Sequence, residues 1–294
     1  MISIRDLSVS YGRVRALDGL SLEIPGRGVF GLLGRNGAGK TTTIRSILGI
    51  VRRNSGEVMV SGRDPSGDPS VKRGVSVLFS EDGLVPALTV LDNLVVWAGL
   101  FGFGRQRSAE MAESVLSRME ASDLSDHSVG DLSTGNRRIA ALARTFMRDA
   151  DLYILDEPTA SLDPVRASEV RETIRMLAGA SPVILSTHNL HEAEELCGEV
   201  AVIDSGRLVM TGRPGEIGDE GGRFVVRCEA YPLVFRGELL QPGADGSVVL
   251  ESEEPAADVL AGILAEGNRV VEFRQAKRSL SDVFLRLMAG GEKR

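Results

Sequence analysis

The chain has 294 residues, a net charge of −7 at pH 7 and a hydrophobic content of 43%, enough for one large or two moderate domains. It contains no apolar run of the roughly 18 residues that a membrane-spanning helix needs, and no recognisable signal segment, so we expect a cytoplasmic chain. The acidic balance, without long lysine or arginine runs, argues against nucleic acid as a partner. Cys197 and Cys228 lack neighbours at metal-ligand spacing and are expected to be reduced and buried.

The N-terminal part of the chain is predicted to be extended. Residues 2–4 and 20–24 alternate apolar and polar side chains with the period of a β-strand, and Tyr11 and Gly12 are expected in the turn between them. An apolar run at residues 28–33 then predicts a buried strand. These short strands indicate a fold built around a sheet.

A phosphate-binding loop is predicted directly after this strand. Residues 34–42 fit the pattern G-x-x-x-x-G-K-[ST], and a helical pattern follows at residues 43–48. Glycines let backbone N–H groups turn towards phosphate oxygens, and the helix N-terminus adds partial positive charge. We expect Lys40 to reach the terminal phosphates of a nucleotide and the Thr41 hydroxyl to hold Mg²⁺; a glycine-rich turn without a ligand is the alternative. The nucleotide-binding residues of this loop are then Gly34, Arg35, Asn36, Gly37, Ala38, Gly39, Lys40, Thr41 and Thr42.

A pair of carboxylates follows a second apolar strand. Residues 152–155 are apolar and lead into Asp156 and Glu157, which places both side chains at the carboxyl edge of a sheet, where ligands bind in open α/β folds. Asp156 would hold Mg²⁺, and Glu157 would orient or deprotonate the attacking water. The alternative is a strand that ends in a solvated acidic turn.

A turn that bears a hydroxyl and a glycine provides a second candidate anion site. Residues 90–127 show helical periodicity, and the sequence LSTGN at residues 132–136 then precedes an arginine-rich helix predicted at residues 137–147. Small residues at a helix start can bind an anion through N–H groups and the helix dipole. An ordinary serine cap is the alternative.

The remaining elements complete a largely parallel sheet covered on both faces and a smaller second domain. A third buried strand is predicted at residues 183–186, and a glycine-rich polar stretch at residues 214–222 marks a boundary. The small α+β domain beyond it is predicted from strands at residues 224–228, 248–250 and 270–273 and helices at residues 255–265 and 280–288.

In their order and spacing, these motifs resemble the nucleotide-binding ATPase subunit of an ATP-binding cassette (ABC) transporter over residues 1 to about 215. The resemblance implies an α/β P-loop NTPase fold, with a RecA-like parallel-sheet core, antiparallel N-terminal strands and a helical subdomain at about residues 88–145. A small C-terminal α+β domain at residues 222–294 would follow. The resemblance also implies ATP and Mg²⁺ as cofactors, ATP hydrolysis with Glu157 and His188 as catalytic residues, and a second copy of the chain as head-to-tail partner.

The resemblance assigns further roles residue by residue. Tyr11 matches the aromatic residue that stacks on adenine; a packed surface tyrosine is the alternative. Asp163 matches the loop that joins the two halves of a dimer, and His188 matches the switch histidine that contacts the γ-phosphate. The positions of the signature turn that would contact the partner's nucleotide are Ser133, Gly135 and Asn136.

Two places depart from the family's pattern. The glutamine that usually precedes the helical insert aligns with Ser80, next to Glu81, so Ser80 or Glu81 is the candidate for a further metal contact. In the signature turn, Thr134 replaces the usual glycine and Asn136 the usual glutamine. We therefore expect ATP hydrolysis to be retained and the glutamine-dependent metal contact to be altered.

The C-terminal end narrows the function. Residues 278–287 resemble the closing helix of the drug- and antibiotic-export (ABC-2 type) branch, which implies an ATPase subunit that powers efflux through a separate integral-membrane permease and is held by it at the inner face of the membrane. The alternatives are an ATPase for lipid, polysaccharide or haem export or for permease assembly, and a soluble ABC ATPase outside transport. The single cassette without a long heptad array argues against the last. The permease is expected to contact apolar residues of the helical insert, namely Leu84, Val85, Trp97, Phe101 and Phe103.

Overall fold

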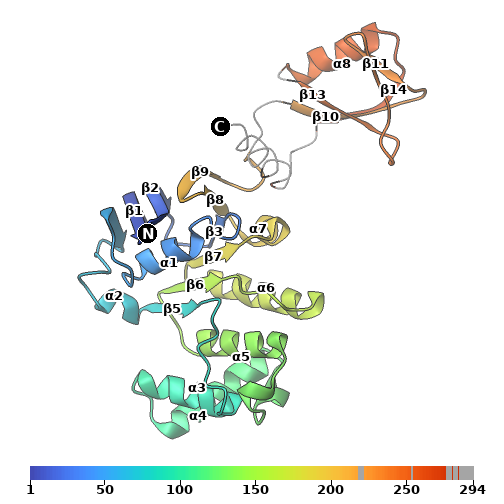
Figure 1. The fold of residues 1–294 in the computed structure, drawn as a ribbon. Coiled ribbons are helices and arrows are strands. Elements are labelled where there is room, and N and C mark those ends of the chain that lie inside the picture. Colours follow the sequence, from blue (N-terminus) through green and yellow to red (C-terminus); the bar gives the residue numbers. More distant parts are fainter. Residues whose placement is uncertain (218–221, 253, 276–279, 281–283, 285–294) are drawn as a thin grey trace. The chain divides into compact units, whose positions relative to one another are not determined.

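The computed structural model describes residues 1–217, 222–252 and 254–275, together with Leu280 and Phe284. The chain divides into two compact units, Met1–Gly212 and Arg213–Arg294 (Figure 1). The division lies just before the stretch at residues 214–222 that the sequence analysis takes as a boundary. Among the described residues, none of the helices has the length and apolar character needed to span a bilayer.

A six-stranded sheet forms the centre of the first unit, in the order β5-β6-β7-β3-β8-β9. Neighbouring strands run parallel from β5 to β8, whereas β9 pairs antiparallel with β8. β3, β6 and β7 are wholly buried, as expected of apolar strands covered on both faces. The strands are β3 (Val29–Leu33), β5 (Val75–Leu78), β6 (Leu152–Asp156), β7 (Val183–Thr187), β8 (Glu199–Asp204) and β9 (Arg207–Gly212).

The parallel arrangement brings the predicted functional loops to one edge of the sheet. Helix α1 (Lys40–Ile47) follows β3, α6 (Pro164–Ala178) follows β6, and α7 (Leu190–Leu196) follows β7. Because parallel strands end at the same edge, the loops between these strands and helices emerge side by side there. The phosphate-binding loop, Glu157 and His188 lie in those loops, and Asp156 is the last residue of β6.

A second, antiparallel sheet covers α1. It has the order β2-β1-β4 and comprises β1 (Ile2–Tyr11), β2 (Val14–Ile24) and β4 (Ser55–Val60). β1 and β2 alternate buried and exposed residues over much of their length, and the buried side chains pack in one cluster with Phe30, Ile154 and Ile184 of the central sheet. The short α2 (Ser70–Arg73) leads from this sheet towards β5.

A helical segment is inserted between β5 and β6. It consists of α3 (Val90–Leu100), α4 (Arg105–Arg118), the 3-10 turns η1 (Ser122–Leu124) and η2 (Val129–Asp131), and α5 (Thr134–Phe146). Thr89 caps α3 by accepting a hydrogen bond from the Asp92 N–H at 3.0 Å. α5 contacts α3 and α4 on one side and β5 on the other, so it joins the helical segment to the central sheet.

The second unit is a small α+β domain by itself. Its three-stranded antiparallel sheet has the order β13-β10-β14, and a separate hairpin pairs β11 with β12. Phe224, Val226 and Leu250 lie in an apolar cluster with Val259 and Ile263 of α8. The elements are β10 (Gly222–Cys228), β11 (Leu233–Phe235), β12 (Glu238–Leu240), β13 (Val248–Ser252), α8 (Ala256–Ala265) and β14 (Val270–Gln275).

The α/β fold class predicted from the sequence is confirmed, with differences in individual elements. α1 begins at Lys40 rather than at residue 43, and α5 begins at Thr134 rather than at residue 137, because each helix starts inside the motif that precedes it. Tyr11 is the last residue of β1 rather than part of the turn. The sequence analysis did not assign β4, β5, β8, β9, β11 or β12. The helix predicted at residues 280–288 lies outside the described residues, apart from Leu280 and Phe284.

Candidate nucleotide-binding site

The phosphate-binding loop depends on glycine at two positions. A Cβ on Gly34 would lie 2.3 Å from the backbone oxygen of Ile203, and Gly39, which caps α1, has a φ of 113°. A Cβ on Gly39 would also lie 2.9 Å from the Ala16 carbonyl oxygen. The loop therefore packs closely against β2 and β8, and it leaves the N-terminus of α1 free of side chains that would compete for its N–H groups.

Lys40 points back into this loop from the first turn of α1. It is only 6% exposed, and its ammonium group donates hydrogen bonds to the carbonyl oxygens of Gly34 at 2.7 Å and Arg35 at 3.3 Å. Its Nζ lies 3.7 Å from Oε1 of Glu157. A fixed positive charge thus stands between the loop and the carboxylate that follows β6, where a terminal phosphate can be held.

Three oxygen-bearing side chains converge beside Lys40. The Thr41 hydroxyl donates to Oδ2 of Asp156 at 2.9 Å, and the Ser80 hydroxyl donates to the same oxygen at 3.2 Å. Carboxylate and hydroxyl oxygens are ligands that Mg²⁺ takes, and Mg²⁺ is commonly held by one or two carboxylates together with substrate phosphates and waters. The described residues include no group of three or more His, Cys, Asp and Glu that could hold a metal ion by themselves. The donor set fits a nucleotide-bound Mg²⁺.

Glu157 is held between the ends of two strands. Its N–H donates to the Ser186 carbonyl oxygen at 2.8 Å, and its Oε2 lies 2.8 Å from Nδ1 of His188, which follows β7. Its Oε1 is buried and accepts no hydrogen bond. His188 is 61% exposed, so the ring reaches outwards from the sheet edge while still contacting the carboxylate. A carboxylate oxygen that accepts no hydrogen bond from the protein can accept a proton from a bound water.

A cavity of about 210 Å³ brings most of these residues together, and the Lys40, Thr41, Asp156 and Glu157 side chains all face it. Its lining adds Ala16 of β2, which the sequence analysis missed because a single alanine outside the motifs carries no chemical signal. The complete lining is Ala16, Arg35, Asn36, Gly37, Gly39, Lys40, Thr41, Thr42, Ser80, Asp156 and Glu157.

The other predicted residues lie outside this cavity. Tyr11 is 46% exposed at the end of β1, and Glu81 is exposed next to Ser80. Ser133 caps α5 by accepting from the Asn136 N–H at 3.2 Å, and Gly135 lies in the first turn of that helix. Asp163 caps α6, accepting from two N–H groups at 3.0 and 3.1 Å. The structure thus shows helix caps at the signature turn and at Asp163, and it leaves their roles as predictions.

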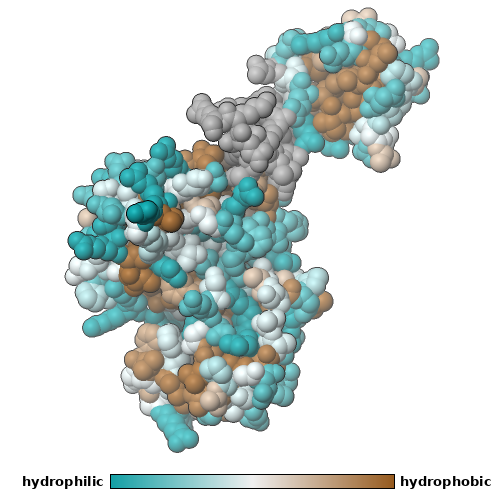
Figure 2. All heavy atoms as spheres, in the orientation of Figure 1, coloured by the Kyte–Doolittle hydropathy of each residue, from teal (hydrophilic) through white to brown (hydrophobic). Residues whose placement is uncertain are grey.

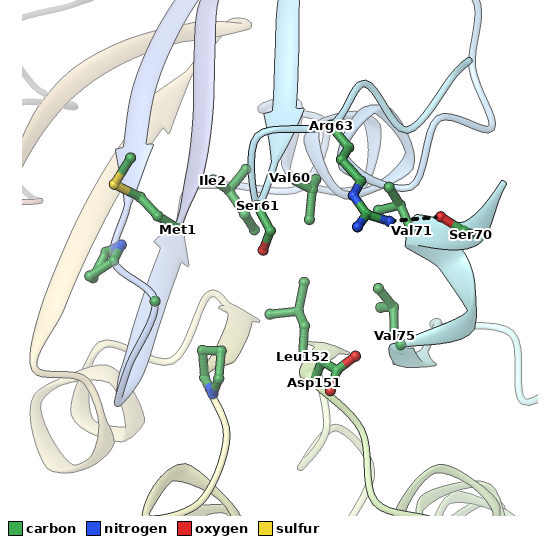
Figure 3. A pocket seen from close by; sticks show the side chains of 14 residues that line it. Met1, Ile2, Val60, Ser61, Arg63, Ser70, Val71, Val75, Asp151 and Leu152 are labelled. Atoms are coloured by element: carbon green, nitrogen blue, oxygen red, sulfur yellow. Dashed lines mark hydrogen bonds between the residues drawn. The ribbon is translucent and has the colours of Figure 1, made fainter. Parts of the chain in front are cut away.

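A second cavity lies away from the functional loops, between β1, β4 and α2 and the starts of β5 and β6 (Figure 3). It has a volume of about 260 Å³. The labelled apolar side chains that face it include Ile2, Val60, Val75 and Leu152, and Arg63 at its rim donates to the Ser70 hydroxyl (Figure 3). It contains neither the glycine loop nor the carboxylates, so the smaller cavity is the candidate nucleotide site.

Comparison with known proteins identifies the family. Residues 17–160 match the family described as ABC transporter. The chain is 35% identical to the Nod factor export ATP-binding protein I of Cupriavidus metallidurans, with 98% of this chain and 97% of that protein covered. It is 34% identical to the daunorubicin/doxorubicin resistance ATP-binding protein DrrA of Streptomyces peucetius, with 94% and 89% covered. The chain therefore belongs to the ABC transporter family.

Solved structures agree on the fold. An ATP-binding subunit of an ABC transporter superposes with a TM-score of 0.67 at 24% identity, covering 74% of this chain and 91% of that one. A dimeric ATP-binding cassette bound to ADP and phosphate gives a TM-score of 0.67 at 19% identity, covering 72% and 98%. Family membership and the curated relatives make the chain an ATP-binding and ATP-hydrolysing subunit of an ABC transporter.

Proposed function

We propose that this chain hydrolyses Mg²⁺-ATP at the edge of its central sheet, with Glu157 as the group that activates water. The observation that carries the proposal is the placement of the Glu157 carboxylate between Lys40 and His188. Lys40 and the loop N–H groups would bind the terminal phosphates, and Thr41 and Asp156 would hold Mg²⁺. When bound, the metal neutralises phosphate charge. His188 would hold the Glu157 carboxylate and reach the γ-phosphate from the exposed side.

The signature turn is proposed to bind the nucleotide held by a second copy of the chain. Ser133, Gly135 and Asn136 stand at the N-terminus of a 13-residue helix and do not line the cavity of their own chain. N–H groups at a helix N-terminus bind phosphate well, so they are suited to the nucleotide of a head-to-tail partner. Asp163, exposed at the start of α6, would contribute to the same interface, and exposed Tyr11 would stack on the adenine.

The helical segment is proposed to contact the permease. Figure 2 shows apolar side chains gathered over this part of the first unit. Leu84 is buried and Trp97 is partly buried, whereas Val85, Phe101 and Phe103 are exposed. Phe101 and Phe103 also line a hollow of about 580 Å³ on this segment. Exposed aromatic groups around a groove are suited to a short cytosolic helix of a membrane protein.

The transported molecule is proposed from the relatives. One of them is named for daunorubicin/doxorubicin resistance, so we assign this chain to efflux of a drug-like compound from the cytoplasmic side of the membrane. ATP-driven uptake of daunorubicin into inverted vesicles that hold the chain with its permease tests this assignment. Uptake of a lipid or polysaccharide in place of the drug would contradict it.

The catalytic proposal is tested by Glu157→Gln. The swap keeps the size of the side chain and removes the charge that activates water, so turnover should fall by about hundredfold or more while ATP still binds. The head-to-tail dimer should then accumulate with ATP. Phosphate release and the mass in size-exclusion chromatography measure both effects. Glu57→Gln is the matched control, because Glu57 is exposed on β4 and does not line the nucleotide cavity. Turnover at the wild-type rate in Glu157→Gln would contradict the proposal.

A further inference from the structure

Arg138 joins several backbone segments behind the carboxylates. It lies on α5 and is 7% exposed. Its Nη2 donates to the carbonyl oxygens of Asp156 and Glu157, the latter at 2.6 Å, and its Nε donates to the Pro158 carbonyl oxygen at 3.3 Å. Its Nη1 donates to the Phe79 carbonyl oxygen at 2.8 Å. One side chain thus ties residues 156–158, which we call the catalytic loop, to the residue that precedes Ser80.

Packing alone does not explain why a charged residue occupies the buried position of Arg138. Burial lowers the pKa of Arg138, and the negative charges of Asp156, Glu157 and Asp82 oppose that shift. A buried cation is costly unless its donors are paired, and an aliphatic side chain would fill the same space without that cost. The planar guanidinium can instead donate in several directions at once, which lets it fix separate carbonyl groups in one geometry.

The catalytic loop needs this support because Glu157 has a strained backbone. Its φ is +53°, in the left-handed region that residues with a Cβ rarely adopt. In this conformation the carboxylate lies against His188 on one side and Lys40 on the other. The Glu157 N–H is held by Ser186 of β7, and the Glu157 carbonyl oxygen is held by Arg138. The two contacts fix both peptide groups of the residue.

We propose that Arg138 is a positioning residue that holds the catalytic loop and thereby aims the Glu157 carboxylate at the reacting water. The inference rests on the proposed role of Glu157. It also connects two parts of the chain that sequence motifs treat separately, because α5 begins at the signature turn and contacts α3 and α4. A displacement of the helical segment, on which the permease is proposed to act, is transmitted through Arg138 to the carbonyl groups of the catalytic loop and of Phe79.

The test compares Arg138→Lys with Arg144→Lys. Lysine keeps the charge but cannot serve the same set of carbonyl groups from a planar fork. We expect turnover in Arg138→Lys to fall by roughly tenfold to hundredfold, with the Kd for ATP unchanged within about threefold. Arg144 is the matched control: it is on the same helix and also 7% exposed, and it stacks on the Trp97 ring rather than contacting the catalytic loop. Arg144→Lys should keep turnover within about threefold of the wild type.

A second measurement does not depend on activity. Hydrogen exchange of the peptide that spans residues 153–160 should be faster in Arg138→Lys and unchanged in Arg144→Lys. Wild-type turnover in Arg138→Lys would overturn the proposal. The proposal would also be overturned if turnover in Arg138→Lys and Arg138→Gln fell only in proportion to their melting temperatures. Arg138 would then stabilise the fold without positioning Glu157. A failure of the proposed function is distinguished from this outcome, because Glu157→Gln would then hydrolyse ATP at the wild-type rate.

Discussion

The two units of the chain differ in what they bury. In the first unit, Lys40, Arg138, Asp156 and Glu192 are all below 10% exposed and lie near the edge of the sheet where the parallel strands end. Among the described residues of the second unit, the buried side chains are apolar except for Ser247. Glu192 accepts from the Thr159 hydroxyl at 2.7 Å, which adds a further buried contact beyond the predicted motifs.

This difference indicates where function was added to the fold. Burying a charged group costs free energy unless hydrogen bonds or opposite charges compensate it. Lys40 and Asp156 line the nucleotide cavity and Arg138 holds the loop behind it, whereas the described residues of the second unit form an apolar core that needs only packing. The first unit is therefore the part in which single substitutions should change nucleotide binding or turnover, and the second unit is the part in which they should change stability.

The largest expected effect concerns the reactivity of the cysteine thiols. Cys197 lies in the first unit and Cys228 in the second. Burial and the nearby Glu192 carboxylate raise the pKa of the Cys197 thiol from its usual 9.0 to about 12. At pH 8 the reactive thiolate fraction of Cys197 is therefore roughly a thousandfold below that of an unperturbed cysteine, and it should grow about tenfold per pH unit up to that pKa. Burial also raises the pKa of Cys228.

Iodoacetamide labelling followed by mass spectrometry measures this effect. Cys197 should label roughly a thousandfold more slowly in the native chain than in urea at pH 8, while the two cysteines label equally in urea. Labelling of native Cys197 at the rate seen in urea would mean that the first unit opens readily, and the contrast between the two units would be lost.

The next effect concerns nucleotide affinity. Lys40→Ala removes a desolvated charge that would contact phosphate, so the Kd for ATP should rise about hundredfold, equivalent to roughly 2.7 kcal/mol. Lys72→Ala is the control, because Lys72 lies on α2 and does not line the nucleotide cavity. Isothermal titration of both variants decides the matter. Equal affinities in the two variants would remove Lys40 from the site.

A smaller effect is expected at the position where the family usually has glutamine. The Ser80 hydroxyl donates to Asp156 at 3.2 Å, whereas Glu81 is exposed and does not line the cavity. Ser80→Ala should lower turnover within about tenfold, or roughly 1.4 kcal/mol, because Thr41 still contacts the same carboxylate oxygen. Glu81→Ala should change turnover by less than Ser80→Ala. Steady-state ATPase assays with and without the permease test both, and a larger loss in Glu81→Ala would show that the glutamate has taken over the contact.

The sequence predicted some elements of the first unit and missed others. The apolar strands β3, β6 and β7 and the motifs at their ends were predictable because residue type alone encodes burial and phosphate binding. The strand β9 was not assigned, since none of its residues is buried and it is defined by its pairing with β8 at the sheet edge. The contacts of Arg138 were also hidden, because backbone carbonyl groups form them and every residue has one. Both features depend on contacts between segments that are distant in the sequence, and a local sequence pattern does not encode such contacts.

The smallest expected effect tests whether the units are independent. Among the described residues, the apolar cluster that contains Phe30 and Ile154 extends along the chain to Leu208, and the cluster of the second unit begins at Phe224. Every predicted nucleotide-binding residue lies in Met1–Gly212. A chain truncated after Gly212 should therefore fold cooperatively and bind ATP with a Kd within about twofold of the full chain.

Circular dichroism during heating and titration with a fluorescent ATP analogue measure folding and affinity of the truncated chain. Truncation removes neither buried polar groups of the site nor strands of the central sheet, so a tenfold loss of affinity would have no local cause. Such a loss, or an insoluble product, would show that the second unit stabilises the first. The two units would then share one folding equilibrium. The distinction between a first unit that carries the chemistry and a second unit that folds independently would have to be abandoned.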